Sequence, residues 1–448
     1  MSNTENKLVP GKPRLGWFID GNPGTESIAV MLQNTGKVIE LTVPLQHVWG
    51  AEDPYGRWWA DDTIHFGDDP DRTLYEYRPP RVLLMGDPRG TVVLVGCRAA
   101  DFHCNHKIGE GRIVANFAVL GATHLKYEKI QGLRSDLPAL AAWTRLSSMS
   151  VEREISDSNR LQSFEMKLDN ATPIQLARTL NLEMKSTWRI ERPNDSFLAY
   201  EGVELFTTVK RARSWGEHLE VHQAILDLVS ITAWKPFGIS RLSAQRTDDP
   251  ETSISGDAMG ERWLPVETHR FPPHEPWART PNFLFPYNEI GPRGIARWLQ
   301  LRKTYSRVIA PLMNILRSEH PWGQPSLVQS GIALEALGYL IDTQKHEGKN
   351  LNSRKQMSFK SGLKVIADDM ESTPIEGIDE WAERATAAFM GAKHPDRNES
   401  DSLLQLNTLR DNLLMVRFWI GLQLGAKPKS LNAALTFDPL ANKFVPLD

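Results

Sequence analysis

Cysteine is scarce in this sequence, which excludes a fold held together by disulfides. The 448 residues include only Cys97 and Cys104, and so low a content is typical of a reducing compartment. Long apolar runs are missing as well. No stretch of about 18 apolar residues occurs, so no membrane-spanning helix is expected. Residues 1–12 are polar and lack the apolar centre of a secretory signal. The sequence therefore predicts a cytoplasmic protein without membrane contact.

Several common catalytic motifs are also absent. The chain has no phosphate-binding Gly-x4-Gly-Lys-Ser/Thr loop, no Gly-x-Ser-x-Gly nucleophile elbow and no His-Glu-x-x-His zinc motif. An excess of positive charge is missing too, because 52 Lys and Arg stand against 55 Asp and Glu, for a net charge of −3. This balance argues against bulk nucleic-acid binding. It leaves room for a local basic site, since net charge averages over domains.

Short apolar runs, broken by Gly, Pro, Asn and Asp, dominate from about Trp17 to Leu125. Such runs are typical of strands in an antiparallel sandwich or barrel-like domain. A short helix is predicted near 134–146, with Asp136 as N-cap, and an amphipathic helix over 214–234. Ser214 and Glu217 have the spacing of a capping box at the start of the second helix. The runs that we interpret as strands are 38–43, 81–85, 91–97, 113–120, 163–168 and 187–190.

Residues 243–290 are polar and rich in Pro, Asp and Gly, and we interpret them as an exposed connector. After Gly294 apolar residues recur at three- and four-residue steps, which predicts a helical bundle. Pro311 falls inside the first of these helices and is expected to kink or split it. Gly425 has the position of a C-terminal cap after the last helix. The helices are predicted near 294–318, 326–343, 355–371, 376–392 and 401–424.

Two clusters could carry chemistry. Cys97, His103, Cys104 and His106 offer two thiols and two imidazoles, but their spacing is not that of a known zinc knuckle. A buried thiol at the end of a strand is the more common arrangement, and we predict no bound metal and no other cofactor.

The second cluster is Lys393, His394 and Arg397, at the junction between two predicted helices. These residues could simply complement the dipole at a helix C-terminus. Alternatively His394 is a general acid/base, and Arg397 or Lys393 binds phosphate.

At this point the sequence resembles ApeA-type abortive-infection proteins. The C-terminal third is similar to their HEPN domain in three segments: Ser330–Tyr339, Gly391–Arg397 and the closing helix from Leu409 to Gly425. The front half resembles the ApeA N-terminal domain. This similarity lies in Val119–Leu125, in Leu140–Trp143 and in the segment that begins at Arg297.

The resemblance implies an α+β multidomain protein with an antiparallel β-rich N-terminal domain, a mixed middle region and an all-α HEPN-like bundle. The expected division is a flexible leader (1–15), a β-rich ApeA N-terminal-like domain with short helices (16–240), a connector (241–293) and the bundle (294–448). The implied activity is phage defence by a dimeric, metal-independent ribonuclease, regulated by a β-rich sensor domain. The implied partners are RNA as substrate, with tRNA as one candidate, a phage component as trigger, and a second copy of the chain.

HEPN nucleases carry an Arg-x4–6-His motif, and this chain departs from it. The positions where the Arg would stand are Ala387, Ala388 and Phe389, and the nearest upstream arginine is Arg384. His394 is therefore the one position that the family motif transfers, while Arg397, Lys393 and Arg384 are candidates on physical grounds. The alternative is a catalytically inactive HEPN-type binding or dimerisation protein with a partner-sensing N-terminal domain.

Overall fold

The chain forms two compact units in the computed structural model, and each unit is assembled from separate stretches of sequence. The structure describes residues 6–19, 27–46, 55–59, 69–105, 108–193, 195–272, 274, 276–394, 396–397 and 401–445. Unit 1 comprises Met1–Asp136, Glu204–Glu220 and Ile239–His274, and unit 2 comprises Leu137–Val203, Val221–Gly238 and Glu275–Asp448.

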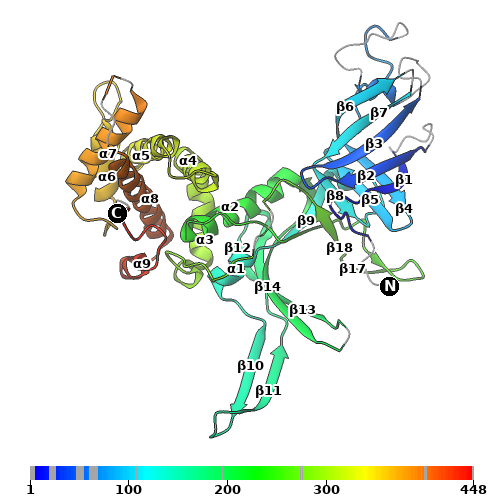
Figure 1. Cartoon of the computed structure of the whole chain (residues 1–448), viewed down its shortest axis with the longest axis horizontal. Helices are drawn as coiled ribbons and strands as arrows, with labels where there is room; N and C mark the ends of the chain where they lie inside the picture. Colours follow the sequence, from blue (N-terminus) through cyan, green and yellow to red (C-terminus); the bar gives the residue numbers. More distant parts are fainter. Residues whose placement is uncertain are drawn as a thin grey trace. The chain divides into compact units, whose positions relative to one another are not determined.

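Unit 1 is built on antiparallel strands, as predicted for the front half of the chain (Figure 1). In sequence order its elements are β1 (Arg14–Ile19), β2 (Ala29–Asn34), β3 (Ile39–Gln46), η1 (Gly56–Trp59), β4 (Val82–Asp87), β5 (Gly90–Val95), β6 (Arg98–Asn105), β7 (Ile108–Ala115), β8 (Phe117–Leu120), η2 (Lys126–Glu128), β9 (Lys129–Asp136), the second part of β14 (Leu198–Ser214), the start of α2 (Trp215–Ala233), β15 (Arg241–Gln245), β16 (Glu251–Thr252), β17 (Ala258–Gly260) and β18 (Trp263–Glu267). Hydrogen-bonded neighbours follow the order β14-β9-β15-β18-β8-β5-β4-β1-β2-β3-β7-β6, and β16 pairs with β17.

Strands β4, β5 and β8 are buried on both faces, which explains their unbroken apolar sequences. Along β5, Val92 and Leu94 belong to one core cluster, while Val93 and Val95 belong to a second. Alternate residues of β4 and β8 divide between the same two clusters. A strand covered on both sides needs apolar residues at every position rather than at every second one.

Two strands of the main sheet, β15 and β18, lie where the sequence predicts an exposed connector, with the short pair β16 and β17 between them. β15 pairs with β9 and with β18, and β18 pairs with β8, so residues 241–293 contribute to the sheet. The buried apolar side chains of β15 and β18 are Leu242, Ala244, Leu264 and Val266. They occupy the second and fourth positions of two five-residue strands, and so short an apolar signal is easily hidden in a polar segment.

The capping box at the start of α2 is confirmed. The Glu217 carboxylate accepts from the Ser214 backbone N–H at 3.0 Å, and the Glu217 N–H donates to the Ser214 hydroxyl at 3.3 Å. The predicted cap of α1 (Pro138–Thr144) is wrong. Its N-cap is Leu137, without a side-chain cap, whereas the Asp136 carboxylate accepts from the Arg241 guanidinium at 2.8 Å. The Asp136 carboxylate, which the sequence predicts to cap the helix, instead forms an ion pair with Arg241 on a neighbouring strand.

A buried histidine in unit 1 provides a test of acid stability. His218 on α2 is fully buried, its Nδ1 lies 2.8 Å from the Thr207 hydroxyl, and burial lowers the pKa of its imidazole. The unfolded chain therefore takes up a proton more readily below about pH 6.5. We expect the free energy of unfolding to fall on acidification by up to about 1.4 kcal/mol per pH unit from this residue. Chemical denaturation of His218→Gln should show a smaller fall in the free energy of unfolding between about pH 7.5 and 5.5 than that of the wild type. The control is His320→Gln at an exposed position, which should retain the wild-type slope.

Unit 2 combines helices with two small groups of strands. Its elements are α1, β10 (Met149–Ile155), β11 (Leu161–Leu168), β12 (Ile174–Ala177), η3 (Thr179–Asn181), β13 (Leu182–Glu191), the first part of β14, the remainder of α2, α3 (Tyr287–Thr304), α4 (Ser306–Arg317), α5 (Gln324–Lys345), α6 (Phe359–Asp368), α7 (Ile378–Lys393), α8 (Ser402–Leu424) and α9 (Pro428–Leu435). β10 and β11 form an antiparallel ribbon of mostly exposed residues that projects from unit 2 (Figure 1). The predicted helical C-terminal part is confirmed.

Two details of the helices differ from prediction or extend it. The helical conformation is interrupted at Tyr305, between α3 and α4, and Pro311 lies inside α4. Pro311 is the sixth residue of α4, so it removes the hydrogen bond to the Arg307 carbonyl, and the helix nevertheless continues to Arg317. At the other end of the bundle, Gly425 adopts a φ of 101° after α8, and the prediction of a glycine cap there is confirmed. α9 follows it and has no counterpart among the predicted helices.

Polar side chains in the core of the bundle link three helices. The Trp381 indole N–H on α7 donates to Asn412 on α8 at 3.1 Å, and the Asn412 amide donates to the Ser330 hydroxyl on α5 at 3.0 Å. Buried polar groups need such partners, so this chain of bonds fixes the register of α5, α7 and α8. In the part of the chain that the structure describes, no helix is long and apolar enough to cross a membrane.

Candidate functional site

Helix α7 presents the predicted histidine at its C-terminal end. The helix buries Trp381, Ala385, Ala388 and Phe389 on one face, a spacing that packs an amphipathic helix against its neighbours. It ends at His394, where the backbone is extended and the N–H donates to the Met390 carbonyl at 3.0 Å.

The side chain of His394 is half-buried, while Lys393 and Arg397 on either side of it are exposed. The Arg397 N–H donates to the His394 carbonyl at 3.1 Å, which closes a tight turn. The Lys393 ammonium lies 5.2 Å from the centre of the Phe389 ring, at the distance of a cation–π contact. Among the described residues, no carboxylate forms an ion pair with any of these three side chains. An imidazole that solvent can reach therefore lies in the same turn as two cations that have no ion-pair partner among the described residues.

Arg384 has a different environment. Its guanidinium forms an ion pair with Asp411 on α8 at 3.0 Å, and Arg410 contacts the same carboxylate at 2.5 Å. The Asp411 side chain is only 3% exposed, so this pairing is largely shielded from water. The structure thus places Arg384 in a contact between α7 and α8 and records no contact between Arg384 and His394 within its described residues. Lys393, His394 and Arg397 are the predicted site residues that share one turn.

The departure from the Arg-x4–6-His motif is visible in three dimensions. Ala388 and Phe389 are buried in the bundle, whereas Ala387 is exposed. An arginine at Ala388 or Phe389 would require a charged group inside the core. These positions of α7 are used for packing.

The cysteine cluster has no metal-binding arrangement in the parts that can be described. Cys97 is buried, and burial raises the pKa of its thiol to about 12, so the thiolate that a metal needs is disfavoured. Cys104 is half-buried on β6, and His106 lies outside the described residues. Within the described parts of the chain, no group of three or more His, Cys, Asp or Glu side chains is placed to hold a metal.

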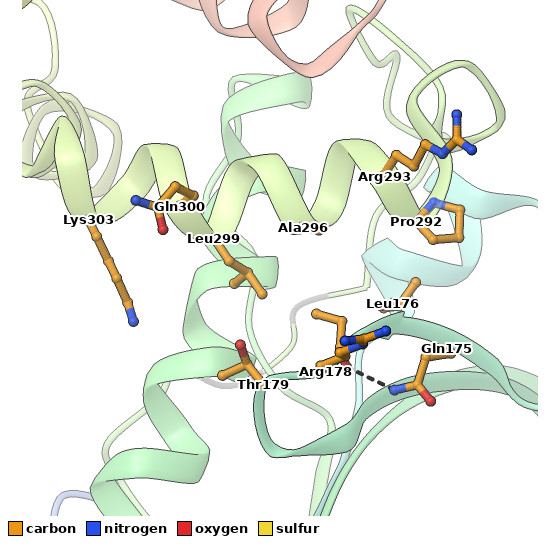
Figure 2. A pocket seen from close by; sticks show the side chains of 11 residues that line it. Gln175, Leu176, Arg178, Thr179, Pro292, Arg293, Ala296, Leu299, Gln300 and Lys303 are labelled. Carbon is orange, nitrogen blue, oxygen red and sulfur yellow. Dashed lines mark hydrogen bonds between the residues drawn. The ribbon is translucent and has the colours of Figure 1, made fainter. Parts of the chain in front are cut away.

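Unit 2 also contains a groove that the sequence analysis does not anticipate (Figure 2). It has a volume of about 510 Å³ and lies between one face of α3 and the segment that joins β12 to η3. The lining residues are Gln175, Leu176, Ala177, Arg178, Thr179, Pro292, Arg293, Ala296, Leu299, Gln300 and Lys303. They include three cations and no carboxylate. Arg178 is distant in sequence from Arg293 and Lys303, so only the fold brings the cations together. The one available signal was the spacing of Arg293, Gln300 and Lys303 on a single helix face.

The fold defines an α+β multidomain protein with an antiparallel front half and a helical C-terminal part. The family model for ApeA N-terminal domain 1 matches residues 14–298, and the chain belongs to this family. The match confirms the predicted resemblance of the front half and identifies an ApeA-like protein, which points to anti-phage defence. Among the curated proteins and the solved structures, no significant match to this chain is found.

Proposed function

We propose that this protein is a phage-defence ribonuclease in which His394 is the general acid/base of a HEPN-type site. The observation that carries the proposal is the imidazole of His394, half-buried at the end of α7 between the exposed cations Lys393 and Arg397. Membership of the ApeA N-terminal family supports the defence role. The β-rich unit 1 would sense a phage component, and unit 2 would cut RNA, with tRNA as one candidate.

The geometry suits cleavage through the ribose 2′-hydroxyl. His394 would take the proton from this hydroxyl, whose oxygen attacks the adjacent phosphorus while the bond to the 5′ oxygen breaks. The products are a 2′,3′-cyclic phosphate and a 5′ hydroxyl, which receives a proton from an acid in the site. Lys393 and Arg397 would stabilise the negative charge that develops on the phosphate oxygens. DNA lacks the nucleophile, so RNA is the substrate.

We further propose that the chain acts as a symmetric homodimer. One His394 with two neighbouring cations is a sparse active site, and a two-fold axis would bring a second identical set to the same cleft. Arg384 remains a candidate only if activation releases it from Asp411, to which it is paired at 3.0 Å. Light scattering on the purified protein would measure the size of the assembly.

The test is RNA cleavage by the purified protein in the presence of EDTA. We expect the wild-type chain to produce cyclic-phosphate ends, and His394→Ala to be slower by at least about 100-fold, the contribution typical of one acid/base group. The matched control is His346→Ala. His346 follows Lys345 at the end of α5 just as His394 follows Lys393, and it is exposed. Equal rates for His394→Ala and the wild type would refute the assignment of His394.

A second function is favoured by a specific observation, the use of Ala388 and Phe389 for packing together with the pairing of Arg384. On this alternative the bundle is a catalytically inactive binding or dimerisation module, and unit 1 recognises the partner. A wild-type chain that leaves RNA intact, but whose toxicity in phage-infected cells is the same in the wild type and in His394→Ala, would support it.

A further inference from the structure

The groove of unit 2 is a long, open surface rather than an enclosed pocket. One wall is the face of α3 that carries Pro292, Arg293, Ala296, Gln300 and Lys303. Ten residues separate Arg293 from Lys303, which corresponds to about 15 Å along a helix axis. Figure 2 shows these two cations toward opposite ends of the helix, with Lys303 reaching down beside the groove and Arg293 turned outward at the rim.

The opposite wall is the end of β12 with the two residues that follow it, Arg178 and Thr179, and a side-chain hydrogen bond is made to its backbone. The Gln175 amide donates to the Ala177 carbonyl at 2.8 Å, and the guanidinium of Arg178 lies beside it in Figure 2. The half-buried Leu299 supplies apolar surface between the cations, whereas Leu176 is buried. The wall from α3 and the wall from the end of β12 therefore both contribute positive charge around an uncharged floor.

None of the three cations is neutralised within the described structure. Arg178, Arg293 and Lys303 are exposed, and no ion pair or hydrogen bond of their side chains is recorded among the residues described. The groove is lined by no Asp or Glu, although the whole chain carries a net charge of −3. The local charge of the groove is thus opposite in sign to the net charge of the whole chain. A positively charged surface attracts an anion.

The distance between the cations indicates which anion fits. A single phosphate is too small to lie against Arg293 and Lys303 at once, since their helix positions are about 15 Å apart. Successive phosphates of an extended strand could do so, with sugar and base carbon atoms against Leu299. Arg and Lys are the side chains that most often bind phosphate groups.

We propose that this groove binds the backbone of single-stranded RNA through Arg178, Arg293 and Lys303. The choice of RNA rests on the proposed ribonuclease function, but the groove is separate from the His394 turn. Its role is to hold the substrate strand, so its residues bind and do not take part in the chemical step.

The experiment measures binding without cleavage. The His394→Ala chain serves as the background, and the ligand is a short fluorescent single-stranded RNA followed by anisotropy at several salt concentrations. Three phosphate contacts in the groove contribute about −2 to the slope of a plot of log K against log salt concentration, in addition to any contribution from Lys393 and Arg397. Replacing Arg178, Arg293 and Lys303 together by Gln should weaken binding at low salt by at least about tenfold and make the slope less negative by about 2. Each single replacement should reduce the slope by about 0.7.

The matched control is Arg307→Gln, which removes the same charge from an exposed position on α4 outside the groove. It should bind RNA as its background does. All four positions are exposed, so thermal unfolding of every variant should match its background, which excludes misfolding as the cause.

Three results would overturn the proposal. The first is unchanged affinity and slope in the triple variant. The second is competition by a mononucleotide as strong as that of the RNA, which would indicate a site for a small phosphorylated molecule. The third is equal competition by oligoglutamate, which would indicate an acidic protein partner. A wild-type chain that fails to cut RNA but binds it through these cations would refute the ribonuclease and leave the groove assignment standing.

Discussion

Replacing Arg417 with methionine is expected to lower the free energy of unfolding by about 3–5 kcal/mol. The Arg417 side chain on α8 is fully buried, and its guanidinium pairs with the Asp438 carboxylate through two bonds of 2.7 Å. It also donates to the carbonyl oxygens of Ile231 and Thr232, at 2.8 and 2.9 Å. These carbonyls belong to the last turn of α2, where a helix has no internal partners for them.

The expected loss is large because Met leaves the buried Asp438 carboxylate without its cation and removes one of the two donors from each of the Ile231 and Thr232 carbonyls, which keep the Trp234 and Leu284 N–H groups. The Asp438 side chain is 1% exposed, so its charge would stay in the interior with the Leu440 N–H at 2.9 Å as a remaining partner. An unpaired buried carboxylate costs far more than the net value of an exposed ion pair.

The measurement is urea denaturation of the purified protein, and a double variant provides the control. Arg417→Met with Asp438→Leu removes both charges, so part of the lost stability should return. The carbonyls of Ile231 and Thr232 would each still be short of one donor, with the Trp234 N–H at 3.3 Å and the Leu284 N–H at 2.9 Å as their remaining partners, which sets a limit on the recovery. If Arg417→Met alone is as stable as the wild type, the buried pair does not have the role assigned to it.

Gly338→Ala is expected to destabilise the bundle by about 1–3 kcal/mol, although alanine is the better helix former. A Cβ atom at Gly338 on α5 would lie 2.6 Å from the Cα and the carbonyl oxygen of Gly362 on α6. Backbone atoms cannot turn aside as the end of a flexible side chain can, so the two helices would have to move apart. The gain in helix propensity, about 1 kcal/mol, is smaller than the cost of this overlap.

The same helix pair supplies a matched control. A Cβ atom at Gly362 would meet the Met357 sulfur at 3.4 Å and the Gly338 Cα at 3.8 Å, both ordinary contacts. Gly362→Ala should therefore be neutral or stabilising by up to about 1 kcal/mol. Thermal unfolding of the two variants side by side would show opposite shifts, and equal shifts would contradict the one-sided close approach.

The sequence predicts the parts of this fold that depend on local pattern. The continuous apolar residues of β5 indicate a strand, and the Ser214 and Glu217 spacing predicts a cap that the structure contains. The sequence does not predict contacts between distant segments. The partner of Arg417 and the partner of Arg384 follow from how helices pack, and no spacing along the chain predicts either pair.

The candidate site shows the same division. His394 is identified from the family motif and from its position after a helix, and the structure places it at that helix end. The groove depends on Arg178 facing α3, which requires the turn through η3 and the start of a helical segment at Pro292. In contrast, Arg384 is close to His394 in sequence but is bound to Asp411. Closeness in sequence therefore does not predict which partner a long side chain such as that of Arg384 contacts.

The interleaved course of the chain limits how this protein can be dissected. The chain passes between the two units after Asp136, Val203, Glu220, Gly238 and His274, so a protease that cuts once cannot release either unit whole. A fragment that begins at residue 294 would include Arg417 but lack the α2 carbonyls to which it donates. Loss of activity in such a fragment would therefore reflect a damaged core and would say nothing about the chemistry at His394. Transplanting the helices into another protein would require the strand region and part of α2 as well.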